Sequence, residues 1–320
     1  MNLLVAQSGG PTAVLNQSLI GVVDEALKSR RFGKVFGSRN GLRGLIRGDL
    51  VELSQVSSYS RKQIRNLPGA FLGTHRLPLD RNAFLLCTRR MREAGIGAFA
   101  YIGGNGSMDT VRQILLTSKM VGFPLLGVGV PKTVDNDLCE TDHSPGFGSA
   151  ARHNALAVYH AGLDTEAVGL VDRVKVIEVM GRDTGWLAAA TALARGIPDR
   201  AWGQTPSLPR CQSPSPHLII LPERPLRIPA FLSAVRTCLE RQGHCVVVTS
   251  EGARDSRGRP LSASSHGLDL DGAGQVQYGG AAQALSAATG SHGCRCLSLP
   301  LCSPGHAGTA PQEPRVKSSV

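Results

Sequence analysis

Aromatic residues and dense basic runs are scarce in this 320-residue chain. Phenylalanine, tryptophan and tyrosine together make up 4% of the residues, so the chain has few of the rings on which single-stranded nucleic acids stack. The 35 Lys and Arg against 24 Asp and Glu give a formal net charge of +11, but the basic residues are scattered. We therefore expect phosphorylated small molecules as partners and no nucleic acid.

The sequence also lacks any apolar run near the roughly 20 residues that a membrane span requires. Its first residues, MNLLVAQSGG, contain no charged region before an apolar stretch. The eight cysteines are irregularly spaced, and Cys294 and Cys296, near Cys302 and His306, match no common zinc-binding pattern. We expect a cytoplasmic protein with reduced thiols, without a membrane partner and without a metal site in that segment.

Strands followed by glycine turns and helices organise most of the chain. The length predicts about two domains. A strand NLLVAQ leads through SGGPT to a helix from Asn16 to Leu27, and a strand from Ala98 to Ile102 leads through a glycine turn to a helix from about Met108. Further buried strands are expected at 124–131, Val174–Val179, His217–Leu221 and His244–Thr249. The pattern predicts an α/β fold of two doubly wound lobes with mainly parallel sheets, and ligands beyond the carboxyl ends of the strands.

Two segments interrupt this pattern. Residues 203–216 are rich in Pro and Ser, which predicts a surface loop. Residues 286–320 are rich in Ser, Gly, Cys and Pro without a sustained period, so we expect an irregular tail that is disordered or out of frame.

The run PKTVDNDL, residues 131–138, carries the strongest chemical signal. Lys132, Asp135 and Asp137 directly follow a predicted buried strand. A carboxylate can take a proton from a hydroxyl while an ammonium balances phosphate charge, and Thr133 can orient the pair. The alternative, a solvated acidic turn capping a helix, gives no reason to set two carboxylates beside a lysine. The glycine turns SGGPT and GGNGS supply backbone amides for phosphates, which together indicates phosphoryl transfer.

The motifs SGGPTAVLNQS, GGNGS, PKTVDND, PGFGSAAR, EVMGR and PER resemble, in order and spacing, those of the phosphofructokinase family over residues 1 to about 285. The resemblance implies a glycolytic enzyme that transfers a phosphoryl group from ATP or pyrophosphate to the 1-hydroxyl of fructose 6-phosphate. It also implies Mg²⁺ and assembly as a homo-oligomer, a dimer or tetramer. Residues 1–140 would form the phosphoryl-donor lobe and residues 141–285 the fructose 6-phosphate lobe, which we expect to be incomplete.

The resemblance also assigns roles to individual residues. The catalytic residues would be Asp135 as general base, Lys132 and Arg182. The sugar contacts would be Thr133, Asp137, Met180, Gly181, Arg182 and Glu223, with Arg173 offered to the sugar phosphate of a neighbouring subunit. The donor would be held by Gly10, Arg76, Gly104, Gly106 and Ser107. The metal would lie at Asn105.

The sequence departs from the family at informative positions. Asn105 stands where the family has an Asp that helps to hold magnesium, so we expect weaker metal binding. Gly106 leaves room for a nucleotide and favours ATP, whereas Lys132, where ATP enzymes commonly carry Gly, favours pyrophosphate; we favour pyrophosphate slightly. A family strand with a Gln-Arg pair that clamps the sugar phosphate is not found. The alternative function is therefore an impaired, truncated relative that only binds phosphate ligands or regulates. An oxidoreductase is disfavoured because neither glycine turn matches the dinucleotide fingerprint.

Overall fold

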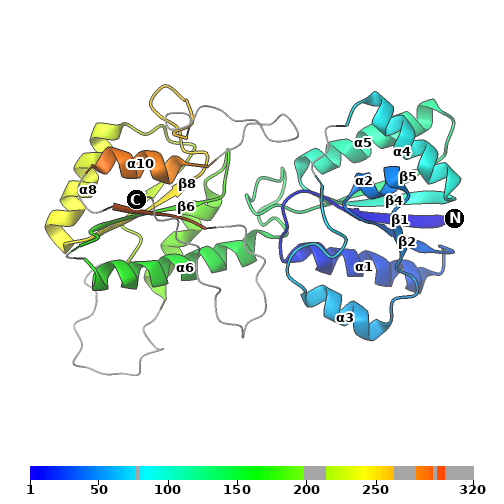
Figure 1. Ribbon diagram of the computed structural model, residues 1–320, viewed down its shortest axis with the longest axis horizontal. Coiled ribbons are helices and arrows are strands. Elements are labelled where there is room, and N and C mark those ends of the chain that lie inside the picture. Colours follow the sequence, from blue (N-terminus) through cyan, green and yellow to red (C-terminus); the bar gives the residue numbers. More distant parts are fainter. Residues whose placement is uncertain (76–78, 170, 198–213, 263–278, 291–293, 300–320) are drawn as a thin grey trace.

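The computed structural model consists of two lobes that lie side by side, each a β-sheet with helices on both faces (Figure 1). The structure describes residues 1–75, 79–169, 171–197, 214–262, 279–290 and 294–299. Within these ranges no helix is long and apolar enough to cross a membrane. The two-lobed α/β architecture confirms the expected fold class.

The first lobe is built on a five-stranded sheet of order β3-β2-β1-β4-β5, in which only the β2–β3 pair is antiparallel. Its strands are β1 (Asn2–Gln7), β2 (Val35–Ser38), β3 (Leu50–Glu52), β4 (Ile96–Gly103) and β5 (Leu126–Pro131). Its helices are α1 (Val14–Ser29), α2 (Leu42–Arg47), α3 (Ser58–Asn66), α4 (Arg81–Glu93) and α5 (Asn105–Met120). One apolar cluster lies between the sheet and α1 and α3, and a second lies between the sheet and α2, α4 and α5.

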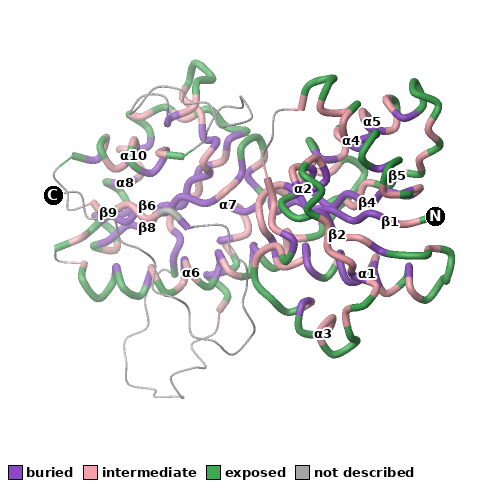
Figure 2. The backbone as a smooth tube through the Cα atoms, turned by 45° about the vertical axis from the view of Figure 1, so that its right-hand side comes forward, coloured by how far each residue is buried: buried purple, intermediate pink, exposed green. Residues whose placement is uncertain are grey.

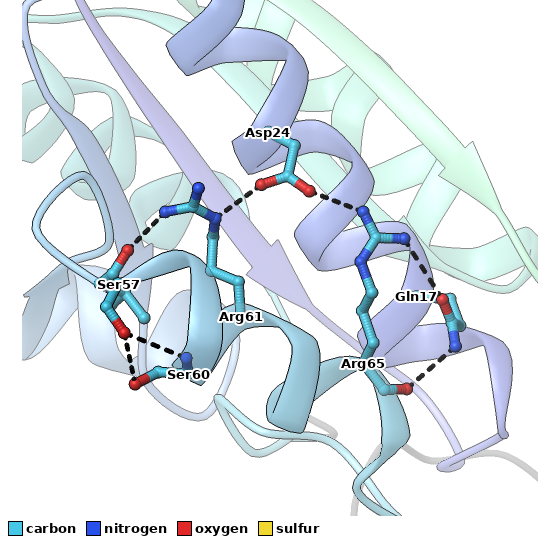
Figure 3. A network of polar contacts seen from close by, with 7 residues as sticks. Gln17, Asp24, Ser57, Ser60, Arg61 and Arg65 are labelled. Carbon is cyan, nitrogen blue, oxygen red and sulfur yellow. Dashed lines mark hydrogen bonds and ion pairs between the residues drawn. The ribbon is translucent and has the colours of Figure 1, made fainter.

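Helix α3 is attached to α1 by a charged cluster around Asp24 (Figure 3). The two carboxylate oxygens of Asp24 accept from Arg61 Nε and Arg65 Nη2, each at 2.6 Å. Gln17 Nε2 donates to the carbonyl oxygen of Arg65 at 3.1 Å. These groups are partly exposed, so the cluster adds modestly to stability and mainly fixes the orientation of α3.

The second lobe has a four-stranded, fully parallel sheet of order β7-β8-β6-β9. Its strands are β6 (Val174–Val179), β7 (Leu218–Ile220), β8 (Cys245–Ser250) and β9 (Cys294–Ser298). Its helices are α6 (Phe147–Ala167), α7 (Trp186–Ala190), the 3₁₀ helix η1 (Thr191–Gly196), α8 (Ile228–Gln242) and α10 (Ala281–Thr289). Helices α8 and α10 cover one face, and α6, α7 and η1 cover the other. Figure 2 shows that the central strands of both sheets are buried, whereas the outer sides of the helices are exposed.

The predicted strands are confirmed to within two residues, but three predictions are wrong. The strand expected to be buried at 124–131 is β5, which lies at the edge of its sheet and exposes Leu126 and Val128. Helix α5 begins at Asn105 rather than near Met108. The tail expected to be irregular from residue 286 contains the end of α10 and the strand β9, which pairs with β6 in the register Val176↔Cys296. Cys294 and Cys296 pack into the apolar cluster on one face of the sheet, and Leu297 packs into the cluster on the other face. This alternation is too short to be recognised in the sequence among the surrounding Gly and Ser residues. Residues 300–320, and most of the predicted loop at 203–216, lie outside the described residues.

Candidate functional site

The carboxyl ends of the two sheets meet at the loop that follows β5. Lys132 to Asp137 leave β5, while Met180 to Arg182 leave β6 and Glu251 leaves β8. The hydroxyl of Thr184 donates to the carbonyl oxygen of Asp135 at 2.6 Å, which joins the two lobes directly. Because parallel strands present their carboxyl ends at one edge, residues far apart in sequence converge here.

Lys132 holds the two glycine turns of the first lobe together. Its backbone N–H donates to Gly103 O at 2.9 Å, and its ammonium Nζ donates to Gly10 O at 2.6 Å. The side chain is only 5% exposed. A Cβ at Gly9, whose φ is +74°, would lie 3.3 Å from Nζ, so a glycine is required where this turn passes the lysine. The result is a fixed, buried positive charge between both turns.

The two glycine turns lead directly into the N-termini of helices α1 and α5. The N-cap residues Ala13 and Gly104 provide no side-chain cap, so the first amide N–H groups of each helix remain suited to an anion. A Cβ at Gly106 would meet nothing within 4 Å, whereas Ser107 is buried behind it. Of the predicted donor residues, Gly10 contacts the Lys132 ammonium, while Gly104, Gly106 and Ser107 lie at the start of α5.

A rigid turn aims the two carboxylates of the PKTVDND run. Asn136, between them, adopts a left-handed backbone with φ 56°. Its side-chain Nδ2 donates to Asp142 O at 3.1 Å, and its Oδ1 accepts from Ser144 N at 2.7 Å. Thr133 Oγ1 accepts from the backbone N–H of Asp135 at 3.1 Å. Thr133 and Asn136 therefore position the backbone of this turn, and Asp135 with it.

Asp135 has the electrostatics of a proton acceptor. The pKa of Asp135 is raised to about 6, first by burial and then by the charge of Asp137, while the charges of Arg182 and Lys132 oppose the rise. Its Oδ1 is buried and has no hydrogen-bond partner within the described part of the chain. A buried polar atom left without a partner is unusual in a folded protein, and here it leaves an oxygen ready to bind a ligand hydroxyl.

Asp137 and Asn105 form a second polar pair at the same edge. Asn105 Nδ2 donates to Asp137 Oδ2 at 2.9 Å, and Asp137 Oδ1 is buried without a hydrogen-bond partner among the described residues. Carboxylate and amide oxygens are the ligands that Mg²⁺ prefers. The Asp137 Oδ1 atom, which has no partner among the described residues, can serve as a ligand for such an ion. Asn105 can provide a second ligand if its amide group rotates so that Oδ1 replaces Nδ2 beside Asp137.

The turn after β6 is tightly packed. Gly181 has φ +131°, and a Cβ there would lie 2.4 Å from Thr184 O and 2.8 Å from Ser250 Oγ. The Ser250 hydroxyl donates to Gly181 O. A side chain at position 181 would therefore distort the turn that carries Met180 and Arg182. The charge of Arg182 acts on Asp135 across the lobes.

Glu251 belongs to the site, and sequence reasoning missed it. Burial raises the pKa of Glu251 to about 7, and the charges of Asp135 and Glu178 add to the rise. A weak bond from Gly181 N at 3.4 Å opposes it. The signal was present, since Glu251 lies two residues after the predicted strand His244–Thr249. Two carboxyl groups with raised pKa values therefore influence each other across the lobes.

Replacing Glu251 by Gln should stabilise the protein at high pH. Because the folded state raises the pKa of Glu251, the folded state binds more protons than the unfolded state between about pH 4.5 and pH 7, so stability falls as the pH rises through that window. We expect E251Q to remove a penalty of up to about 3 kcal/mol at pH 8 and less at pH 5. Urea unfolding at both pH values tests this. Glu25→Gln, an exposed control on α1, should show no such pH dependence.

Of the three remaining predicted residues the structure describes two, which lie at opposite edges of the second sheet. Glu223 follows β7 and is exposed, and its Oε1 accepts from Gly185 N at 2.7 Å, which steadies the loop behind Arg182. Arg173 precedes β6, at the opposite edge of the sheet, where its Nε donates to Gly243 O at 3.1 Å. Within one chain Arg173 is thus not brought to the site, and its role across a subunit contact stays a prediction. Arg76 lies outside the described residues.

Comparison with known proteins gives one consistent family. The family model described as Phosphofructokinase matches residues 2–297. The pyrophosphate–fructose 6-phosphate 1-phosphotransferase of Xanthomonas campestris pv. campestris (strain B100) is 41% identical over 292 residues, which are 89% of this chain and 66% of that protein. The protein of the same name from Rhodospirillum rubrum is 37% identical over 279 residues, 87% of this chain and 65% of that protein.

A solved structure has the same fold. The crystal structure of the pyrophosphate-dependent phosphofructokinase from Marinobacter aquaeolei matches with a TM-score of 0.74 and 34% sequence identity, covering 93% of this chain and 68% of that one. The chain spans about two thirds of the length of the curated relatives it matches.

Proposed function

Because this chain belongs to the phosphofructokinase family, we propose that it transfers a phosphoryl group from pyrophosphate to the 1-hydroxyl of fructose 6-phosphate. The observation that carries the proposal is the buried Lys132 ammonium between the two glycine turns, at the same strand edge as the partnerless Asp135 oxygen. Phosphoryl transfer requires this combination of a cation and amides for the donor and a base for the acceptor hydroxyl. The first lobe, with residues 1–140, would hold the donor, and the second lobe the sugar.

The choice of donor rests on Lys132. In the proposed complex its charge would offset the negative charge that gathers on the phosphate leaving group of pyrophosphate, and its burial would strengthen the interaction. The relatives described above carry pyrophosphate in their names. The open space at Gly106 favours a nucleotide but excludes neither donor.

In the proposed reaction Asp135 accepts the proton of the 1-hydroxyl, whose oxygen attacks the terminal phosphorus of pyrophosphate. The bridging P–O bond breaks, inorganic phosphate leaves, and fructose 1,6-bisphosphate forms. Lys132 and the amides of the glycine turns stabilise the leaving phosphate. Met180, Gly181 and Arg182 would bind the sugar together with Thr133, Asp137 and Glu223, and Glu251 would line the same edge. Arg182 is also placed to steady the phosphoryl group in transfer, since its charge reaches Asp135.

Mg²⁺ fits the same edge. Asp137 and Asn105 would hold the ion, and Mg²⁺, when bound, neutralises phosphate charge. The donor oxygens present, one carboxylate and one neutral amide, carry a single charge, so we propose a weaker metal site than one with two carboxylates. Arg173, at the far edge of the second sheet, would act only on a sugar phosphate in a second copy of the chain.

A donor comparison tests the function. The purified chain is assayed for fructose 1,6-bisphosphate formation, coupled to aldolase, with pyrophosphate or with ATP as donor at saturating Mg²⁺. We expect turnover with pyrophosphate and little with ATP. Turnover with ATP alone would contradict the donor, and no turnover with either, alongside fructose 6-phosphate binding in calorimetry, would favour a binding or regulatory subunit instead.

Replacing Asn105 by Asp should tighten the binding of Mg²⁺. The change places a second carboxylate at the 2.9 Å contact with Asp137, where the two charges repel until a divalent ion lies between them. We expect the Mg²⁺ concentration for half-maximal turnover to fall by about tenfold, an estimate for one added charged ligand. Asp109→Asn, an exposed change one turn further along α5, serves as the control. An unchanged Mg²⁺ titration would place the metal elsewhere.

A further inference from the structure

A cluster of two thiols and an imidazole lies at the amino edge of the second sheet, opposite the candidate site. His217 immediately precedes β7, Cys238 lies in the last turns of α8, and Cys245 is the first residue of β8. One ring nitrogen of His217 and the two sulfur atoms all lie within 4.8 Å of one another. We propose that His217, Cys238 and Cys245 bind a thiophilic divalent cation, namely Zn²⁺.

The spacing fits the coordination geometry of zinc. With Zn–S bonds of about 2.3 Å in a tetrahedral site, two sulfur ligands lie roughly 3.8 Å apart. The three atoms therefore need to move by about 1 Å at most to surround an ion. Cys238 and Cys245 are free thiols and are buried. Two thiolates neutralise Zn²⁺, so the bound core carries no net charge into the apolar surroundings.

The two sulfur atoms are close enough to bind the same ion, since they lie within 4.8 Å of each other and of the His217 ring nitrogen. Cys238 Sγ also donates to the backbone carbonyl of His244 at 3.4 Å. Binding zinc would release the thiol protons, as it does in structural zinc sites.

The imidazole is held in place by the neighbouring strand. His217 N donates to Val246 O at 2.8 Å, and Val246 N donates to His217 Nδ1 at 2.8 Å. A cation that binds the ring must compete with this bond or with the proton on the other ring nitrogen. Losing one neutral hydrogen bond lowers an affinity by no more than about tenfold, which is small against the strength of zinc–thiolate ligation.

An entry path exists. A cavity of about 510 Å³ is lined by both His217 and Cys238, together with Arg195 and Arg241. Solvent in the cavity can provide the fourth ligand. Cys294 is a poorer fourth ligand: it and Cys245 are register partners of the intervening Val174, so their Cα atoms lie roughly 10 Å apart at normal strand spacing.

Cobalt substitution tests the proposal. The full chain, reduced and freed of metal, is titrated anaerobically with Co²⁺ and then with Zn²⁺. We expect a thiolate-to-cobalt charge-transfer band that saturates at one equivalent and is displaced by Zn²⁺. Cys238→Ser should abolish the band. Cys139→Ser, in an exposed loop of the other lobe, and Cys294→Ser should leave it unchanged.

A conservative variant separates ligation from folding. His217→Asn retains an acceptor near the position of Nδ1 for the Val246 N–H but offers a hard oxygen to the metal. We expect H217N to unfold at a temperature close to that of the wild type without metal, and to bind Co²⁺ at least about tenfold more weakly. Zn²⁺ should raise the unfolding temperature of the wild type and not that of C238S. Absence of the band in the wild type, or its persistence in C238S, overturns the proposal.

Discussion

Replacing Asp135 by Asn should lower kcat by about 10²–10⁴-fold, the range expected for loss of a general base. The side chains have nearly the same shape, but the amide cannot take the hydroxyl proton. Asp135 is the base that we propose because its Oδ1 is buried without a hydrogen-bond partner in the described part of the chain and its pKa is raised to about 6, mainly by burial. A base with this pKa is largely ionised at pH 7.5 yet basic enough to act.

The pH dependence of kcat/KM in the wild type provides a second test of Asp135. Because the proposed base Asp135 would have to be deprotonated to act, kcat/KM with pyrophosphate should fall as the pH is lowered through about 6. D135N should lose this acid limb along with its activity. Its stability at neutral pH should rise slightly, since a raised carboxyl pKa destabilises the folded state above that pKa. Inactivity in D135N therefore cannot be attributed to unfolding.

Asp142→Asn is the matched control. Asp142 lies in the same loop and is exposed, and only its backbone carbonyl is used, as the acceptor for Asn136 Nδ2. We expect its kcat and acid limb to match the wild type. An active D135N, or equal losses in both variants, would assign the proton transfer to another group, of which Glu251 is the first to examine.

Replacing Lys132 by Met should lower kcat/KM for pyrophosphate by about 10²–10³-fold, as for the loss of a preorganised group that stabilises transition-state charge. Methionine keeps most of the side-chain length but removes the charge and the bond to Gly10 O. Loss of the bond to the partly buried Gly10 carbonyl adds a cost of about 1 kcal/mol in stability. Steady-state kinetics with varied pyrophosphate, together with urea unfolding, separate the two effects.

A second readout links Lys132 to Asp135. The charge of Lys132 lowers the pKa of Asp135, so its removal should move the acid limb of kcat/KM to higher pH. A merely structural lysine would not produce this shift. Lys119→Met, an exposed change in the last turn of α5, should alter neither the rate nor the limb. A K132M variant that keeps pyrophosphate turnover and an unmoved acid limb would place the donor cation elsewhere.

The C-terminal segment shows where pattern reasoning fails. The strand CRCLS is only five residues long and contains none of the β-branched residues that mark strands. It forms beside β6, where Leu299 N donates to Glu178 O at 2.9 Å and the partly buried cysteines fill an existing apolar cluster. Pairing with β6 and packing against the apolar cluster stabilise this edge strand, whereas its own residues have little strand propensity.

The sequence by itself determined the two-lobed parallel architecture, the glycine turns and the position of Lys132 and Asp135 at a strand end, because buried strands and positive-φ glycines are local features with a characteristic spacing. Tertiary structure alone decided that Lys132 reaches back to Gly10, 122 residues earlier, and that Glu251 shares its environment with Asp135. It also decided that Arg173 lies at the far edge and that His217 meets two cysteines. Proximity and desolvation depend on which strands are neighbours, and strand order is not written in local periodicity.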